Sequence, residues 1–358
     1  MTTNQLPIAN GRPRWRRIGY WLLFVGHLLF LYGCATAPRA VEPLPGNGRE
    51  LTGLEKAKLA VVALVVEQGT SGDSYGAGVV FDTQGHILTV HHVIEGATRI
   101  LVLLSGGYTV RADVVAIDPV FDFAILRAEM FLPERMRPAD LAKELPRPGD
   151  TVWNLGNPFG TSRFGGEPSV GRGVISALHR SYLNEETGRL YLDGIQHDAP
   201  TNPGNSGGGI FNERGELLGL NALITTMRET PGDSGVAFAL PAPVIRKVAE
   251  RLLRGDVVTH GWLGAERYKQ AAEVFPQGHG RLRAVFGPLA QGGPASAAGF
   301  MPGDVIIKVG GNEVFGLHEI LSMEDSLIPG QPVKLTINRA GREFDLDLVV
   351  GSRPWPWG

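Results

Sequence analysis

The chain has 358 residues, which is too long for one ordinary domain and suits two folded domains of unequal size. Lysine and arginine total 34 against 36 aspartates and glutamates, and this net charge of −2 gives no reason to expect nucleic acid as a partner. The 49 glycines and 25 prolines, with short runs of valine, isoleucine and leucine between them, indicate a mainly β protein rather than a helical bundle.

The first residues have the layout of a signal peptide. Four arginines between positions 12 and 17 precede an apolar run from Ile18 to Leu31, and small residues follow it. This run is shorter than the roughly 20 residues that cross a bilayer as a helix. We therefore expect residues 1–34 to be a signal peptide, with an uncleaved N-terminal membrane anchor as the alternative.

The only cysteine, Cys34, follows the apolar run in LYGCATAP. This segment resembles a bacterial lipobox, in which the cysteine is lipidated and becomes the mature N-terminus, and the alternative is an incidental or buried cysteine. A single cysteine excludes an internal disulfide. A lipidated Cys34 would hold the protein at a membrane surface, with residues 35–50 as a linker.

Two series of short strands are predicted in the middle of the chain. Residues 51–66 begin helix-like and become strand-like as β-branched residues accumulate. Turn-bounded strand candidates then recur, which predicts two β-barrels. The candidates are residues 76–82, 86–90, 99–104, 109–117 and 123–128 in the first series, and 150–156, 169–178, 189–196, 208–212, 216–224 and 235–241 in the second.

A predicted helix separates these strands from a smaller module. The segment PAPVIRKVAERLLRG has apolar residues near a 3.6 spacing and ends at Gly255, a residue suited to a helix C-terminus. Strands and two short helices, PASAAGF and about His318 to Leu327, follow. We expect one domain over residues 51–256, a second over 257–351, and a tail over 352–358.

Ser206 lies in the glycine-rich segment NPGNSGGGIFN at 202–212. Glycines allow a tight loop that exposes backbone N–H groups, as a serine nucleophile needs for the oxyanion of its tetrahedral intermediate. Such a segment alone also fits an ordinary turn. His92, in GHILTVHHVIEGA, and Asp122, in DPVFDFAILRA, precede it, so the chain order is His, Asp, Ser.

With these motifs the chain resembles the HtrA/DegP/DegS family of trypsin-like serine proteases. The family pattern T-N-N-H-V is matched by Thr89, His92 and Val93, while Val90 and His91 replace the two asparagines. His92 is the expected base because it directly precedes the valine, and His91 would be an orienting or surface residue.

The family aspartate lies in D-x-x-x-D followed by apolar residues, matched by Asp118 and Asp122. Asp122 corresponds to the catalytic position, and Asp118, before Pro119, is expected to be a solvated turn residue. The segments LGNPFG at 155–160, VGRGVISAL at 170–178 and GVAFALP at 235–241 extend the resemblance.

The resemblance implies a chymotrypsin-like double β-barrel with Ser206 as nucleophile, His92 as general base and then acid, and Asp122 fixing the tautomer of His92. The oxyanion hole would be Gly204, Asn205 and Ser206, with the N–H groups of Gly204 and Ser206 as donors. No metal and no organic cofactor is expected.

Substrate specificity is less constrained by the sequence. No aspartate precedes Ser206 at a trypsin-like specificity position, since Asp198 matches a common family residue, so we expect cleavage after small or medium aliphatic residues such as Val, Ala or Ile. Ala237 stands where the family commonly has glycine. Residues 219–235 resemble the family's activation loop, and an ordinary hairpin is the alternative.

The C-terminal module resembles a PDZ domain. GPASAAGFMPGDVIIKVGGNEV at 293–314 carries the family helix and strand signature. PDZ domains add a C-terminal peptide as an extra strand and hold its carboxylate on backbone N–H groups. The carboxylate loop would be Trp262, Leu263, Gly264 and Ala265. Ile320 and Leu321 on the second helix fit either the peptide groove or the core.

Taken together, the resemblance implies a serine endopeptidase of the bacterial cell envelope, facing the periplasm, that acts on misfolded or regulatory proteins. Its PDZ domain would bind C-terminal peptides, its protease domains would form a homotrimer, and the membrane would be reached through Cys34 or the N-terminal anchor. The alternative is a peptide-binding or chaperone-like scaffold without catalysis.

Overall fold

The computed structural model describes residues 50–69, 72–164, 166–183, 190–224, 235–256, 258–274 and 280–354. By its contacts the chain divides into Met1–Pro43 and Leu44–Gly358. The first unit lies outside the described residues, so the signal peptide, lipidated Cys34 and nearly all of the linker remain predictions. None of the described helices combines the length and the apolar character needed to span a bilayer.

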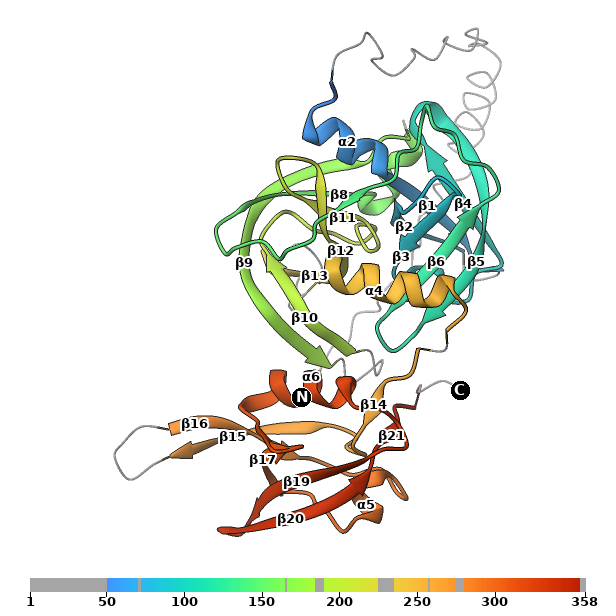
Figure 1. Cartoon of the computed structure of the whole chain (residues 1–358). Helices are drawn as coiled ribbons and strands as arrows, with labels where there is room; N and C mark the ends of the chain where they lie inside the picture. Colours follow the sequence, from blue (N-terminus) through green and yellow to red (C-terminus); the bar gives the residue numbers. More distant parts are fainter. Residues whose placement is uncertain are drawn as a thin grey trace, which may run out of the picture. The chain divides into compact units, whose positions relative to one another are not determined.

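The first barrel is entered through a capped helix. α2 (Gly53–Ala60) starts at Thr52, whose hydroxyl accepts the N–H of Glu55 at 3.3 Å while the Glu55 carboxylate accepts the N–H of Thr52 at 2.9 Å. β-branched residues then continue the chain as a strand, as expected. Six strands close the barrel in the order β1-β2-β3-β6-β5-β4 (Figure 1). They are β1 (Val61–Glu67), β2 (Asp73–Val80), β3 (His86–Thr89), β4 (Arg99–Leu104), β5 (Tyr108–Asp118) and β6 (Phe123–Ala128).

The second barrel follows the order β11-β8-β9-β10-β13-β12, closed by pairing of β11 with β12, and β7 adds to β12 in parallel. Its strands are β7 (Asp140–Leu141), β8 (Thr151–Gly156), β9 (Ser169–Leu183), β10 (Leu190–His197), β11 (Gly209–Phe211), β12 (Glu216–Ile224) and β13 (Ala237–Pro241). The predicted double barrel is therefore confirmed.

Three short helical segments were not predicted: α3 (His91–Ile94) and the 3-10 turns η2 (Ser105–Gly107) and η3 (Pro158–Phe164). The longer α4 (Ala242–Leu253) was predicted, and it packs Ile245, Val248 and Ala249 into the barrel core. Gly255, just beyond this helix, has a φ of +80°, which suits a residue without a side chain.

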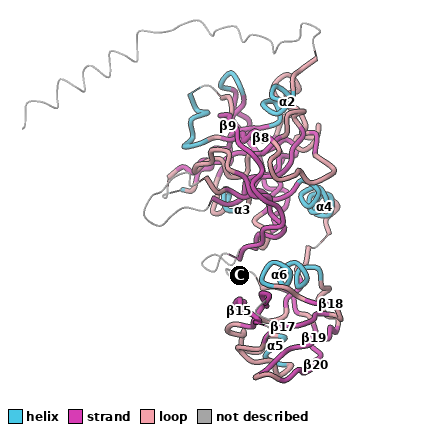
Figure 2. Tube along the Cα trace, turned by 90° about the vertical axis from the view of Figure 1, so that its left-hand side faces the viewer, coloured by secondary structure: helices cyan, strands magenta, loops and turns pink. Residues whose placement is uncertain are grey.

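The described part of the C-terminal domain contains a six-stranded sheet, in which β15-β16-β17-β19-β20 are neighbours in that order and β18 pairs with β17, and a separate β14–β21 pair (Figures 1 and 2). Its elements are β14 (Gly261–Trp262), β15 (Tyr268–Val274), β16 (Gly280–Phe286), α5 (Pro294–Ala297), β17 (Val305–Val309), β18 (Asn312–Glu313), α6 (Gly316–Ser326), β19 (Pro332–Arg339), β20 (Arg342–Val349) and β21 (Gly351–Ser352). Ile320 and Leu321 are fully buried in its core, so they pack the domain rather than line an open groove.

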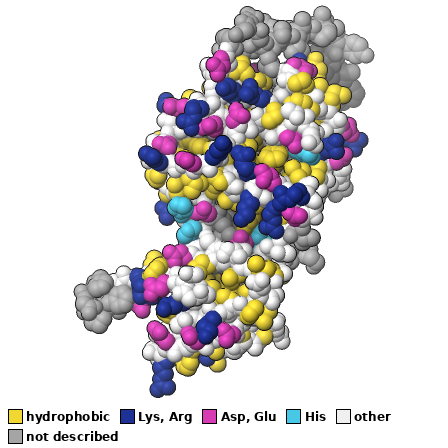
Figure 3. All heavy atoms as spheres, in the orientation of Figure 1, with side chains coloured by type: hydrophobic (Ala, Val, Ile, Leu, Met, Phe, Trp, Pro, Cys, Tyr) yellow, Lys and Arg dark blue, Asp and Glu magenta, His cyan; other side chains and the backbone are white. Residues whose placement is uncertain are grey.

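Acidic and basic side chains are interspersed on the molecular face that Figure 3 presents.

The turn between β5 and β6 belongs to the first barrel, yet its Val120 is buried in the same apolar cluster as the core of the C-terminal domain. The next residue, Phe121, places its ring edge-on against His260 with centroids 4.3 Å apart.

Candidate active site

His92 and Asp122 form a hydrogen-bonded pair at one end of the first barrel. His92 is the second residue of α3, directly after β3, and Asp122 directly precedes β6. Asp122 Oδ2 lies 2.6 Å from His92 Nδ1, and Asp122 Oδ1 accepts the backbone N–H of His92 at 2.8 Å. The carboxylate is fully buried, whereas the imidazole side chain is 30% exposed. The pair therefore fixes the ring while leaving its far side accessible.

The backbone at Asp122 is held in an unusual conformation. Its φ is +55°, a region that few residues other than glycine adopt. Its N–H donates to the carbonyl of Pro119 at 3.3 Å, and its own carbonyl accepts the N–H of His91 at 3.0 Å. His91 is itself buried, with 8% exposure, so of its two expected roles the surface one is wrong, and its backbone helps to hold Asp122.

A side chain from the second barrel completes the surroundings of the carboxylate. Tyr191, on β10, donates its hydroxyl to Asp122 Oδ2 at 2.9 Å. Asp122 thus accepts hydrogen bonds from α3 and from the opposite barrel, and charged acceptors form the stronger hydrogen bonds of proteins. The sequence did not reveal Tyr191, because a tyrosine in a strand most often serves the core.

Ser206 lies on the loop between β10 and β11 and is partly exposed. Its carbonyl accepts the N–H of Ala77 on β2 at 2.9 Å. Gly207 has a φ of +79°, and a Cβ there would lie 2.2 Å from the hydroxyl oxygen of Thr89. Thr89 ends β3 only three residues before His92. Glycine at 207 thus permits the serine loop to approach the strand that leads to the histidine.

Gly204 permits a second close approach. Its φ is +98°, and a Cβ there would lie 2.2 Å from the carbonyl oxygen of Asn157. Within the described residues, the N–H groups of Gly204 and Ser206 have no acceptor, whereas the N–H of Asn205 donates to the Asn202 carbonyl at 2.9 Å. Two of the three residues expected to form the oxyanion hole therefore present available donors, and the Asn205 amide is already used.

Buried polar side chains support the serine loop from below. Asn154 Nδ2 donates to Pro200 O and Thr201 Oγ1, each at 2.8 Å, and Asn154 Oδ1 accepts Asn221 Nδ2 at 2.7 Å. The Asn221 carbonyl in turn accepts the N–H of Gly207 at 2.8 Å. Satisfied buried networks of this kind hold a backbone in one arrangement.

The structure corrects the expectation for Asp118. This aspartate, at the end of β5, is 3% exposed rather than solvated, and both of its carboxylate oxygens lie 3.0 Å from His260 Nε2. His260 Nδ1 lies 2.7 Å from Asp325 on α6. Burial alone would lower the pKa of His260, but hydrogen bonds and charge from Asp118 and Asp325 outweigh it and raise the pKa from 6.5 to about 9.

The predicted peptide loop, Trp262–Ala265, begins at β14. The Leu263 N–H donates to the buried Glu324 carboxylate at 2.6 Å, and the Trp262 indole N–H donates to the Ala265 carbonyl at 3.0 Å. Arg353 binds the other Glu324 oxygen at 2.5 Å, although burial still raises the pKa of Glu324. A carboxylate of the domain itself thus already occupies one backbone donor of the loop.

The remaining predicted features are the activation loop, Ala237 and Asp198. Residues 225–234, the centre of the expected activation loop, lie outside the described residues. Ala237 on β13 is buried, with 1% exposure. Asp198 is exposed and accepts the N–H of Val174 at 2.7 Å.

Comparison with known proteins gives matches in both domains. Residues 76–220 match the trypsin-like peptidase domain family, and residues 281–350 match the PDZ domain family. A probable periplasmic serine endoprotease, DegP-like, of Hahella chejuensis is 35% identical over 289 residues, covering 78% of this chain. A protein of the same description from Pseudomonas putida is 34% identical over 288 residues. This chain spans only 58% and 57% of the length of these two relatives.

Solved structures match over more of their length. The HtrA-type protease AlgW with tripeptide aligns with a TM-score of 0.69 and 30% identity, covering 86% of this chain and 98% of that one. The serine endoprotease from Yersinia pestis aligns with a TM-score of 0.63 and 27% identity, covering 84% of this chain and 97% of that one.

Proposed function

This chain belongs to the HtrA-type serine proteases, and we propose that it is a serine endopeptidase with Ser206 as nucleophile, His92 as base and Asp122 as the group that orients His92. The observation that carries this proposal is the 2.6 Å contact from His92 Nδ1 to a fully buried Asp122, beside a glycine-shaped serine loop. These are the parts of an acyl-transfer site.

The chemistry follows from the protonation states that this geometry favours. Asp122 accepts a hydrogen bond from the Nδ1–H of His92, which leaves Nε2 as the basic nitrogen. Ser206 Oγ attacks the substrate carbonyl carbon as its proton passes to Nε2, and Asp122 stabilises the resulting imidazolium. The imidazolium then protonates the leaving amine, and a water molecule, activated in the same way, hydrolyses the acyl-enzyme.

The developing oxyanion would be bound by the N–H groups of Gly204 and Ser206. Each donor of this kind contributes on the order of 10²–10³ in rate. The N–H of Asn205 would not bind the oxyanion, because it already donates to the Asn202 carbonyl. We propose that the enzyme cleaves its substrates after small or medium aliphatic residues such as Val, Ala or Ile. A peptide-library profile dominated by Arg or Lys would refute this specificity.

The physiological setting is proposed from the relatives. Two of them are described as periplasmic, and we place this enzyme in the bacterial envelope, acting on misfolded or regulatory proteins. The PDZ domain would bind C-terminal peptides at Trp262–Ala265, as a tripeptide accompanies AlgW. We also propose that the protein forms a homotrimer and is attached to the membrane through Cys34 or an N-terminal anchor.

Proteolysis of an unfolded protein tests the proposal. The purified chain should cleave reduced casein and react with a fluorophosphonate probe, and Ser206→Ala should abolish both, with a rate loss on the order of 10⁶. The exposed Ser169 offers a matched control, since Ser169→Ala should leave both unchanged. A folded chain that binds peptides yet shows neither cleavage nor labelling under any condition would favour the non-catalytic scaffold.

A further inference from the structure

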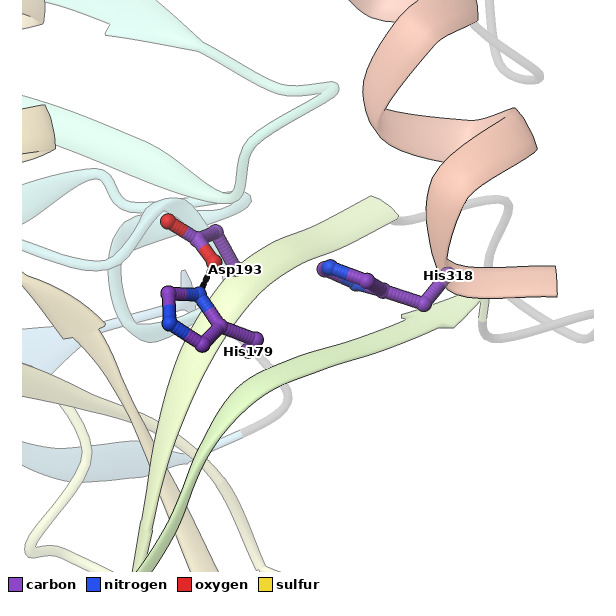
Figure 4. A group of neighbouring side chains, drawn as sticks. All are labelled: His179, Asp193 and His318. Carbon is purple, nitrogen blue, oxygen red and sulfur yellow. Dashed lines mark hydrogen bonds and ion pairs between the residues drawn. The ribbon is translucent and has the colours of Figure 1, made fainter. Parts of the chain in front are cut away.

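Three potential metal ligands that take no part in the proposed triad come together from three elements. They are His179 on β9, Asp193 on β10 and His318 on α6, and one ligand atom from each lies within 4.8 Å of the other two. Figure 4 shows the Asp193 carboxylate against the His179 ring, with the His318 ring directed from the helix toward the same region. The His179 Nδ1 to Asp193 Oδ1 distance is 2.5 Å.

The backbone is irregular where these ligands lie. The register of β9 and β10 shifts between Tyr191 and Gly194 and again between Gly194 and Gln196. The first shift spans Asp193, and His179 lies opposite the second, so irregular pairing re-aims both side chains, as β-bulges beside functional sites do. His179 and Asp193 also have φ values of +56° and +54°. Non-glycine residues in this region cluster at functional sites, and Asp122 of the catalytic pair is another example.

The third ligand is oriented by a residue that is not itself a ligand. Ser181 Oγ lies 2.6 Å from His318 Nδ1 and accepts the backbone N–H of Asp193 at 3.1 Å. When His318 Nδ1–H donates this hydrogen bond to Ser181 Oγ, the lone pair of His318 Nε2 is available to a cation. Metal-binding histidines are usually oriented by such a hydrogen bond at the other ring nitrogen.

We propose that His179, Asp193 and His318 form a binding site for a divalent transition-metal ion of the zinc type. Two imidazoles and one carboxylate suit Zn²⁺, with water as the fourth ligand. Tetrahedral ligand atoms around zinc lie about 3.3 Å apart, so His179 Nδ1 and Asp193 Oδ1 would separate by about 0.8 Å and a pair near the 4.8 Å limit would close by about 1.5 Å on binding. His179 is free to make this adjustment, since its side chain is 58% exposed. The metal would replace the proton that His179 and Asp193 share.

Such an ion would join parts of the chain that the polypeptide itself connects only distantly. His179 and Asp193 belong to the second barrel, whereas His318 belongs to the PDZ domain. Residues of α6 already contact β9 and β10, so the metal would reinforce an existing contact. β10 also carries Tyr191, which binds Asp122, so an ion at Asp193 would hold the same strand. This role is separate from peptide hydrolysis, in which the metal takes no part.

The test uses Ser206→Ala in the full chain, so that neither self-cleavage nor activity affects the result. Titration with Co²⁺ should give the visible absorption of a tetrahedral complex at one ion per chain, and Zn²⁺ should displace it. His179→Gln, Asp193→Asn and His318→Gln should each weaken binding by more than about tenfold, and Ser181→Ala by about tenfold. Zn²⁺ should raise the unfolding temperature of the parent but not of the three ligand variants.

Two other histidine–carboxylate pairs provide controls. His86 lies 2.6 Å from Asp82, and His92 lies 2.6 Å from Asp122. Within the described residues, neither pair has a third potential metal ligand close enough to form a cluster. His86→Gln and His92→Gln should bind Co²⁺ like the parent. Absence of saturable one-to-one binding, undiminished binding in His179→Gln and His318→Gln, or loss of binding in His92→Gln would each overturn the proposal.

Discussion

The turn between β5 and β6 supplies carboxylates to two histidines with opposite requirements. Asp122 holds His92, whose side chain is 30% exposed and must gain and lose a proton in the proposed cycle. Asp118, four residues earlier, holds His260, whose side chain is 5% exposed and has a second carboxylate, Asp325, on its other nitrogen. One carboxylate orients a ring that exchanges protons, whereas two carboxylates keep a ring charged although its burial opposes the charge. The number of partners and the exposure, rather than the residue types, separate the two roles.

Removing the charge of Asp122 should have the largest effect. In Asp122→Asn the amide no longer fixes the Nδ1–H tautomer or stabilises the imidazolium, so kcat should fall by about 10⁴. Steady-state cleavage of a peptide substrate measures this, with circular dichroism to verify folding. A fall of less than tenfold would exclude Asp122 from the assigned role.

The matching change at the other carboxylate should affect stability instead. Asp118→Asn leaves His260 with Asp325 alone and places an amide in a charged, buried site, which should cost about 3 kcal/mol in the free energy of unfolding. Urea unfolding measures this cost. The exposed Asp113 on the same strand is the control, and Asp113→Asn should be nearly neutral. A large drop in kcat for Asp118→Asn without a loss of stability would contradict the division of roles.

The dependence of stability on pH should identify the charged histidine. The pKa of His260 is raised in the folded state, from 6.5 to about 9. Its stabilising contribution is therefore complete below the unfolded pKa and is lost as pH rises through the folded pKa, and it amounts to no more than about 3 kcal/mol. Unfolding free energies near pH 6 and near pH 9.5 measure the loss. His260→Gln should lack this component, and equal losses in both proteins would rule out the ion pair as its source.

The smallest effect is expected at Tyr191. Tyr191→Phe removes one hydrogen bond to Asp122 and keeps the ring, which should lower kcat by about tenfold, corresponding to about 1.4 kcal/mol. Tyr108 is 45% exposed and offers a control, since Tyr108→Phe should not change kcat. An unchanged kcat in Tyr191→Phe would show that the bonds from His92 alone position Asp122.

Local sequence patterns were sufficient to predict most of the strands and helices of the fold. Alternating apolar residues and turn signals located the barrel strands, and Gly255 marked the end of α4. Motifs around His92 and Asp122 selected two residues that the structure joins by a 2.6 Å contact. In these cases the determinants of structure lie within a few residues of the position that they affect.

The residues that the sequence analysis mispredicted or missed have partners that are distant in the sequence. Asp118 precedes a proline and reads as a solvated turn, but its partner His260 is 142 positions away. The β10 tyrosine that contacts Asp122 is 69 positions from it. The irregular pairing that aims His179 at Asp193 likewise arises from the register of two strands, which hydrophobic alternation alone does not determine.

The burial of the β5–β6 turn limits what can be learned from a protease domain expressed alone. Ending the chain before His260 would expose Val120 and the ring of Phe121, and it would leave the Asp118 carboxylate without its cation. Asp122 lies in the same turn, so a truncated enzyme with altered activity would report a disturbed catalytic turn as well as a missing peptide-binding domain. Point substitutions in the PDZ domain separate these two causes, whereas domain deletion combines them.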